Sequence, residues 1–164
     1  VEENIIKSIT GRVISRDVSD YKVSLIDDNI ERLGISNIDV HVYNALDKDD
    51  SLVGKADIVI ADLPCSGLGI MGRKPDIRYN ISPEKISDII RLQRDILEVV
   101  SMYVKPGGTL VYSTCTINRS ENEDNADWIC TSLGFTRDGE YVQMLPSPDK
   151  DNDGFFVARL IKNS

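Results

Sequence analysis

The sequence predicts an α/β protein whose strands form an open sheet, mostly parallel with an antiparallel end. Two observations support this fold class. From residue 13 to residue 134, apolar stretches with the spacing of strands alternate with stretches that have the spacing of helices. After residue 140, two strand-like stretches follow each other with only a loop rich in Pro, Asp, Asn and Gly between them, which favours antiparallel pairing.

The first half of the chain contains three expected strands and one helix. A short strand over residues 13–17 is followed by a helix that Gly34 stops. The apolar face of this helix consists of Val23, Ile26, Ile30 and Leu33. Residues 38–42 alternate between apolar and polar side chains and predict a half-buried strand, whereas the apolar run at residues 56–61 predicts a fully buried one.

The second half contains two expected helices and three strands. Ser82 and Pro83 predict a helix start, and the buried stripe that follows consists of Ile86, Ile89, Ile90, Ile96, Leu97 and Val100. A Pro-Gly-Gly turn at residues 106–108 should lead into a strand over about residues 109–113. Ser120 and Glu123 have the spacing of a capping box and predict a helix with Ala126, Ile129, Cys130 and Leu133 inward, stopped by Gly134. The stretches YVQML and GFFVARLI predict the last two strands.

The composition indicates one soluble domain. With 164 residues, of which 41% are hydrophobic, the chain is long enough for one core. No segment approaches the roughly 20 consecutive apolar residues that span a bilayer, so no membrane partner is expected. The formal charge of -8 argues against a broad nucleic-acid-binding face, because phosphates are contacted mainly by Lys and Arg. An RNA partner would need a local basic patch or another domain.

The three cysteines are an odd number with irregular spacing, which suits neither a disulfide framework nor a zinc site. We therefore expect no metal and a reducing compartment, by default the cytoplasm. Cys130 lies on the apolar stripe of its helix and is expected in the core. Cys65 and Cys115 each follow an apolar strand, and ligands collect at the carboxyl ends of strands in open α/β sheets. If these strands are neighbours, both thiols face one crevice.

Several thiol chemistries can be excluded. The single histidine, His41, lies in an alternating strand, so no Cys-His pair is expected, and no C-x-x-C motif occurs. Neither strand-end cysteine stands in a phosphate-binding loop with a following arginine. A nucleophilic thiol near the carboxylate of Asp62 remains, with the basic residues Arg73, Lys74 and Arg78 close in sequence.

Three glycines, Gly67, Gly69 and Gly72, match the G-x-G-x-x-G spacing of a dinucleotide-binding turn. Such a turn needs a helix to begin at the third glycine, which Pro75 and Pro83 oppose. We interpret the match as a coincidence and expect the glycines to permit a sharp turn or a close backbone approach. A nicotinamide-dependent oxidoreductase would depend on this match alone.

Asp17 ends the first expected strand. An acid at that position can hydrogen-bond the ribose hydroxyls of an adenosine-containing ligand. The glycine loop that normally precedes such an acid is missing from the residues before it. An Asp that acts as N-cap of the following helix fits the spacing equally well, and both interpretations stay open.

Three stretches carry a resemblance to a known family. DLPCSGLGIMGRKPDIRYN, PGGTLVYSTCTINRSENED and DGFFVARLIK closely resemble the NOL1/NOP2/Sun family of RNA cytosine-C5 methyltransferases, most of all its bacterial Sun members, which act on small-subunit (16S) ribosomal RNA. The resemblance covers the chain from Gly11 onward. It implies a Rossmann-like methyltransferase sheet, S-adenosyl-L-methionine as the cofactor and RNA as the partner.

The resemblance also implies a use for two thiols. In this family a cysteine thiolate adds to C6 of cytosine, C5 takes the methyl group of S-adenosylmethionine, and loss of the C5 proton releases the enzyme. The cysteine of the Thr-Cys motif, here Cys115, is the family's nucleophile, and that of the Pro-Cys motif, here Cys65, assists release. DNA cytosine-C5 methyltransferases use the Pro-Cys cysteine as nucleophile instead, and sequence order alone leaves both assignments open.

The remaining site residues follow from the same resemblance. Asp62 matches the acid that hydrogen-bonds the cytosine ring, and it is also expected near the cofactor. Asp17 matches the acid that binds the cofactor ribose. Arg73, Lys74 and Arg78 fall in the family's basic loop, which is expected to contact the RNA backbone. The target base is expected to leave its stack to reach the nucleophile.

The chain departs from the family at two places. Asn44 stands where the family usually has an acid that contacts the adenine amine, so an altered cofactor contact is expected there. The family's glycine-rich cofactor loop would precede Val1, and its strand would be central, between the strands that end at Asp17 and Ala61. We therefore expect residues 1–164 to be one C-terminal methyltransferase domain that lacks this strand and binds the cofactor weakly by itself. A non-catalytic RNA-binding or assembly fragment is the alternative function.

Overall fold

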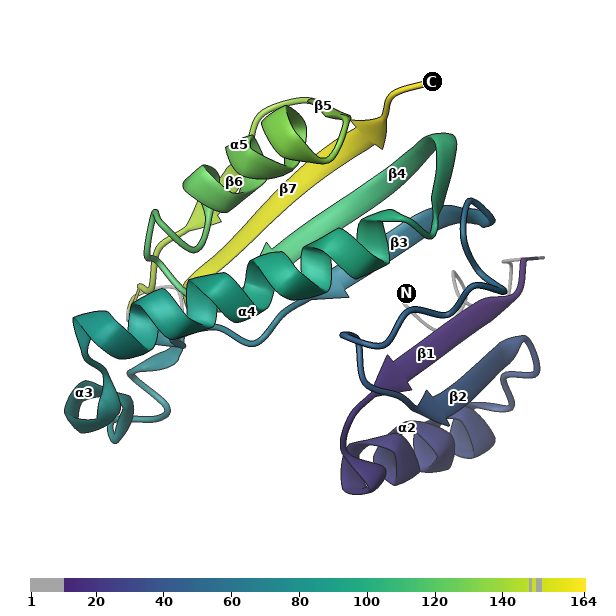
Figure 1. Ribbon diagram of the computed structural model, residues 1–164. Helices are drawn as coiled ribbons and strands as arrows, with labels where there is room; N and C mark the ends of the chain where they lie inside the picture. The colour runs from purple at the N-terminus through teal and green to yellow at the C-terminus, as the bar shows by residue number, and fades with distance from the viewer. Residues whose placement is uncertain (1–10, 148, 150–151) are drawn as a thin grey trace. The chain divides into compact units, whose positions relative to one another are not determined.

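A computed structural model describes residues 11–147, 149 and 152–164 (Figure 1). The chain divides into two compact units, Val1–Asp47 and Lys48–Ser164, and each is described by itself. The site residues that the sequence predicts are distributed over both units.

The first unit is a strand-helix-strand arrangement. It consists of β1 (Val13–Asp17), α2 (Asp20–Leu33) and β2 (Ile38–Val42). The two strands pair in parallel, as a helical crossover requires. Ser19 is the N-cap of α2, and its Oγ accepts the N–H of Lys22 at 3.4 Å. Gly34 ends the helix with φ 64°, the left-handed conformation that glycine adopts without strain. The predicted helix and strands are confirmed here.

The second unit combines one sheet with helices. Its strands are β3 (Ala56–Asp62), β4 (Val104–Thr114), β5 (Phe135–Arg137), β6 (Val142–Met144) and β7 (Phe155–Lys162). Its helices are the short 3-10 helix η1 (Leu68–Ile70), α3 (Ile77–Asn80), α4 (Pro83–Ser101) and α5 (Glu123–Ser132). The strand order is β3-β4-β7-β5, and β6 also pairs with β7. β3 and β4 are parallel and β7 is antiparallel to its partners, so the predicted fold class is confirmed.

The core of this unit lies between the sheet and the two long helices, which lie over the same face (Figure 1). Alternate residues of β3, β4 and β7 point into it, because successive side chains of a strand face opposite sides. Leu97 of α4 and Ile129 of α5 pack against this face. The strand residues buried in it are Ala61, Leu110, Tyr112, Phe156, Ala158 and Leu160.

The other face of β3 differs from the prediction. A fully buried strand was expected at residues 56–61, but Ile58 and Ile60 are 63% and 72% exposed. They point away from the face that α4 and α5 cover, since Ala61 points into the core. A strand of a parallel sheet is normally buried on both faces, and no other described segment of this unit covers these two side chains.

Two local predictions were wrong in detail. The Pro-Gly-Gly stretch at residues 106–108 lies inside β4 and not before it. Ala56 pairs with Val104 and Ile58 with Thr109, so the extra residues form an irregularity within the ladder, with Gly107 at φ 74°. The strand therefore begins earlier than the apolar pattern indicates.

The predicted capping box at the start of α5 is also absent. The N-cap of this helix is Asn122, whose side chain makes no capping hydrogen bond. Its Oδ1 instead accepts the Oγ1 hydroxyl of Thr114 at 2.6 Å, and its Nδ2 donates to the carbonyl of Thr116 at 3.0 Å. The polar residues before α5 therefore bind the end of β4. The structure also adds η1, α3 and β5, which are too short to show a period in the sequence.

β1 and β3 are not paired with each other in the described part of the chain. β1 pairs only with β2, and β3 only with β4. None of the described helices combines the length and the apolar character needed to cross a membrane.

Candidate active site

Cys65 and Cys115 lie side by side at one edge of the second sheet. Cys65 follows the end of β3 by three residues, and Cys115 directly follows β4. Asp62 is paired with Ser113 in this parallel ladder, so both loops leave the sheet at the same edge. The two Sγ atoms are 3.1 Å apart, within hydrogen-bond distance. The expected shared edge is confirmed, while the roles of the two thiols stay predictions.

The surroundings of Cys65 and Cys115 differ from those of Cys130. Cys130 is half-buried on α5 and packs against the core, as expected. Burial, together with the adjacent sulfur of Cys115, raises the pKa of the Cys65 thiol to about 12. Cys65 therefore stays protonated at neutral pH. Its S–H can donate to the sulfur of Cys115, which lies within hydrogen-bond distance.

Of the glycines that match the dinucleotide spacing, Gly69 serves the packing of this site. The N–H of Gly69 donates to the carbonyl of Cys115 at 3.1 Å, and the carbonyl of Gly69 accepts the N–H of Gly154 at 2.8 Å. A Cβ atom at Gly69 would lie only 2.5 Å from the carbonyl oxygen of Gly154, so no larger residue fits without a backbone shift. No helix begins at Gly72, which has nothing within 4 Å of a built Cβ. The absence of a dinucleotide turn here agrees with the prediction.

Asp62 is the last residue of β3 and is exposed. Its Oδ1 accepts the hydroxyl of Ser113, the residue opposite on β4, at 3.2 Å. A carboxylate has about four lone-pair sites, so this contact leaves capacity for a ligand. Its position at the edge from which the cysteine loops leave fits the predicted contact with a cytosine ring.

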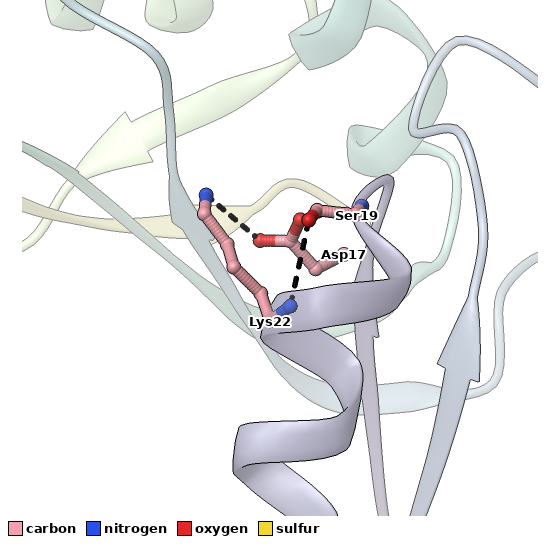
Figure 2. A network of polar contacts seen from close by, with 3 residues as sticks. All are labelled: Asp17, Ser19 and Lys22. Atoms are coloured by element: carbon pink, nitrogen blue, oxygen red, sulfur yellow. Dashed lines mark hydrogen bonds and ion pairs between the residues drawn. The ribbon is translucent and has the colours of Figure 1, made fainter.

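Asp17 ends β1 in the first unit (Figure 2). Its Oδ1 accepts the N–H of Ser19 at 2.9 Å, and its Oδ2 pairs with the ammonium of Lys22 at 3.2 Å. Ser19 is the N-cap of α2, so the alternative in which Asp17 caps the helix is wrong. Asp17 supports the helix start from two residues before the N-cap, and part of its carboxylate stays accessible.

Asn44 lies at the same edge of the first sheet as Asp17. It follows β2 by two residues, and Val42 at the end of β2 is paired with Asp17. The Oδ1 of Asn44 accepts the N–H of Leu46 at 3.1 Å and so forms a local turn. The amide group is exposed, and its NH₂ is a donor where an acid would only accept. The first unit thus presents an acid and an amide at one sheet edge, a pair that fits the ribose and adenine ends of an adenosine-containing cofactor.

The basic loop lies between η1 and α4. Arg73 forms an ion pair with Asp153 at 2.9 Å, which ties the loop to the segment before β7. Lys74 and Arg78 are exposed and make no ion pair among the residues that the structure describes. Tyr79, next to Arg78, is 83% exposed. Two unpaired cations beside an exposed aromatic ring form a surface that suits a nucleic-acid strand.

A pocket of about 200 Å³ lies beside Cys65. Its walls come from the cysteine loop, α3 and the start of α4. It is lined by Cys65, Ser66, Asp76, Ile77, Asn80, Ile81, Lys85 and Ile89. In the described part of the chain, no group of three or more His, Cys, Asp or Glu residues could hold a metal ion.

Two buried residues near the cysteines were missed by the sequence analysis. Gln93 and Glu121 are both fully buried and hydrogen-bonded to the Cys65 loop. Gln93 lies on the apolar stripe of α4, three residues before Ile96. A polar residue on such a stripe indicates a buried polar contact, so the sequence did contain a signal for Gln93. Glu121 lies in the acidic stretch SENED, where nothing in the sequence separates a buried acid from its exposed neighbours.

Comparison with known proteins identifies the family. A family model described as "16S rRNA methyltransferase RsmB/F" matches residues 4–161. The chain belongs to this family. The resemblance to the Sun-type RNA methyltransferases is therefore confirmed at the level of the family.

Individual relatives agree with this assignment. The RsmB/F chain is 35% identical over 175 residues to ribosomal RNA small subunit methyltransferase F of Salmonella paratyphi A, which covers 94% of this chain and 36% of the relative. It therefore spans little more than a third of that relative's length. Among solved structures, NSun6 from Pyrococcus horikoshii with SFG matches with a TM-score of 0.77 and 26% identity over 94% of this chain and 42% of that one. A methyltransferase homolog protein from Pyrococcus horikoshii has a TM-score of 0.79 at 24% identity, covering 93% of this chain and 53% of that one. The fold is that of the Rossmann-like S-adenosylmethionine-dependent methyltransferases.

Proposed function

We propose that the protein containing this chain methylates C5 of a cytosine in small-subunit ribosomal RNA, with S-adenosyl-L-methionine as the methyl donor. Membership of the RsmB/F family supports rRNA methylation. The observation that supports methylation at C5 is the pair of thiols 3.1 Å apart at neighbouring strand ends. Methylation at C5 requires addition of a thiolate to C6 and its later release, and two thiols can share these two steps.

Each residue has a role in this reaction. Cys115 Sγ, as thiolate, forms a bond to C6 of the flipped cytosine, and the electron pair of the C5–C6 double bond becomes available at C5. The bound cofactor supplies an electrophilic methyl group. A base then removes the C5 proton, the C5–C6 double bond re-forms, and the C6–S bond breaks to return the thiolate of Cys115. Asp62 accepts a hydrogen bond from the ring and so stabilises the charge that develops on it.

The protonation of Cys65 supports its assignment to the release step. A thiol with a pKa of about 12 cannot serve as the attacking thiolate at neutral pH. As a protonated neighbour it can donate a hydrogen bond to the Cys115 sulfur as the C6–S bond breaks. The order of roles found in DNA cytosine-C5 methyltransferases, with the Pro-Cys cysteine as nucleophile, is less compatible with the raised pKa of Cys65.

The cofactor and the RNA would be held by different surfaces. Asp17 and Asn44 would bind the ribose and adenine of S-adenosylmethionine at the carboxyl edge of the first sheet. Lys74, Arg78 and Arg73 would contact the RNA backbone. They form the local basic patch that a chain with a formal charge of -8 needs in order to bind phosphates.

Exchange of each cysteine for serine in the complete protein tests the roles. Cys115→Ser should abolish both methyl transfer and covalent RNA adducts, because the C6–S bond cannot form. Cys65→Ser should instead accumulate adducts, visible as slowly migrating protein on a denaturing gel. Adducts that persist in Cys115→Ser would show that the roles are reversed.

Two further measurements separate the remaining alternatives. Transfer of labelled methyl groups to small-subunit rRNA by the complete protein distinguishes an enzyme from a non-catalytic RNA-binding or assembly protein, which would bind RNA without transfer. The sequence motifs resemble the bacterial Sun protein, methyltransferase B, while the curated relative is named methyltransferase F. Mapping the methylated cytosine decides between these two members.

A further inference from the structure

A buried carboxylate lies beneath the two cysteines and has no role in the reaction proposed above. Glu121, in the turn before α5, is 0% exposed. Its Oε2 accepts the N–H of Ser66 at 2.8 Å and the amide of Gln93 at 3.4 Å. Its Oε1 accepts the hydroxyl of Ser66 at 2.6 Å and the amide of Asn118 at 3.1 Å. All four partners are donors, so the carboxylate is surrounded only by groups that suit an acceptor.

Glu121 connects the loops that carry the two cysteines. Ser66 directly follows Cys65, and Thr116 directly follows Cys115. The Oγ atom of Ser66 lies 2.8 Å from Oγ1 of Thr116. Because the Ser66 hydroxyl has one proton and donates it to Glu121, it must accept from Thr116. The hydroxyl of Thr116 therefore points from the Cys115 loop to the Cys65 loop, and the chain of hydrogen bonds ends at the carboxylate.

Further contacts fix the Cys65 loop from its other side. The amide of Gln93 donates to the carbonyl of Pro64 at 2.9 Å, one residue before Cys65. The Oε1 of Gln93 accepts the amide of Asn125 at 2.7 Å, so Gln93 is itself held in place. The hydroxyl of Tyr112 donates to the backbone carbonyl of Glu121. The residues on both sides of Cys65 are thus attached to one buried network.

We propose that Glu121 is a positioning residue that fixes the separation of the Cys65 and Cys115 sulfur atoms. The inference rests on the proposed two-thiol reaction. Removing the carboxylate would leave the buried donors of Ser66 and Asn118 without their acceptor, and one or both loops would then shift. Attack on C6 needs only Cys115, whereas release needs both thiols in contact. The release step should therefore depend most on Glu121.

The exchange Glu121→Gln in the complete protein tests this role. The side chain keeps its shape, but an NH₂ group replaces one acceptor oxygen and faces donors. We expect kcat for methyl transfer to small-subunit rRNA to fall about tenfold or more, with KM for the RNA within about twofold of the wild type. The covalent RNA adduct should accumulate, as expected for Cys65→Ser. Glu123→Gln is the matched control, because Glu123 begins the same helix and no described hydrogen bond joins it to either cysteine loop.

A second variant keeps the test decisive if Glu121→Gln does not fold. Ser66→Ala removes the hydroxyl link between the two loops and leaves the backbone contact with Glu121. It should also accumulate adduct, and combined with Glu121→Gln it should add little, since both changes break the same connection.

Three results would separate the possible failures. Loss of activity in proportion to a lowered melting temperature, without adduct, would overturn the positioning role and leave Glu121 as a stabilising residue only. Normal activity of both Glu121→Gln and Ser66→Ala would overturn it as well. A wild-type protein that forms neither adduct nor methylated RNA would contradict the proposed function itself and not the role of Glu121 alone.

Discussion

At the scale of single residues, the decisive feature is the contact between the two cysteine sulfur atoms. Their 3.1 Å separation follows from two loops that leave neighbouring parallel strands at the same edge. Burial and the neighbouring sulfur raise the pKa of Cys65. The assignment of Cys65 to release is thus argued from its environment as well as from its sequence motif.

The raised pKa of Cys65 predicts its reactivity with an alkylating reagent. Relative to an ordinary thiol with pKa 9.0, a pKa of about 12 lowers the thiolate fraction at pH 8 about a thousandfold. The greater nucleophilicity of the more basic sulfur offsets part of this, so alkylation should be about tenfold or more slower than in the unfolded chain. Mass spectrometry of the Cys65 peptide after a pulse of iodoacetamide measures the rate.

The pH dependence provides the control for this prediction. The rate at Cys65 should continue to rise with pH above 9, where an ordinary thiol levels off. In Cys115→Ser the neighbouring sulfur that raises the pKa is gone, so the rise should end at a lower pH. A rate that levels off near pH 9 in the wild type would show that the Cys65 pKa is not raised.

At the scale of elements, the loop between β3 and α4 is held by backbone contacts around Gly69. This glycine lies between the carbonyl groups of Cys115 and Gly154. Such a close approach has no room for a side chain, whereas the neighbouring glycine of the same sequence motif lies in open space. The spacing therefore reflects a close backbone approach at Gly69 and a left-handed backbone, φ 70°, at Gly67, with no such requirement at Gly72.

A pair of alanine substitutions tests this difference. Gly69→Ala places a Cβ 2.5 Å from one backbone oxygen and 2.8 Å from another, so we expect about 2–3 kcal/mol of destabilisation and weaker methyl transfer. Gly72→Ala meets nothing within 4 Å and should leave the free energy of unfolding unchanged or raise it by up to about 1 kcal/mol. Urea unfolding of the two variants measures both effects. Equal stability of the two would show that the backbone shifts freely at Gly69.

At the scale of the whole molecule, the site residues divide between two units. Asp17 and Asn44 belong to the first, and Asp62 with both cysteines to the second. In the described residues β1 and β3 each have one strand partner, and Ile58 and Ile60 expose a large apolar area on β3. An exposed apolar face on a strand of this type is a binding surface for further structure or a source of aggregation.

This arrangement predicts the behaviour of the isolated chain toward the cofactor. Asp17 and Asn44, which are expected to contact the cofactor, lie at the edge of a sheet of only two strands, and such a sheet holds them less firmly than a larger one. Isothermal titration of the 164-residue chain with S-adenosylmethionine should therefore show no binding at micromolar concentration. The complete protein is the positive control. Micromolar affinity of the isolated chain would contradict the prediction.

The α/β class, most of the strands and helices, and the two strand-end cysteines could be predicted from the residue pattern. These features have periodic or local signals: the spacing of apolar residues, the N-cap at Ser82, and Gly34 at a helix end. Resemblance of motifs supplied the family, which the comparisons confirm. Short elements such as α3 and β5 were not predicted, because they are too short to show a helix or strand period in the sequence.

Which polar residues are buried, and which segments they bind, became visible in the folded chain alone. The polar residues before α5 look like a capping box along the chain, but Asn122 and Glu121 turn inward and bind segments that are distant in sequence. In the same way, the apolar pattern of β3 cannot show that helices cover only one of its faces. A residue's neighbours across the fold determine its burial, its pKa and its hydrogen bonds, and these neighbours leave no periodic mark on the local sequence.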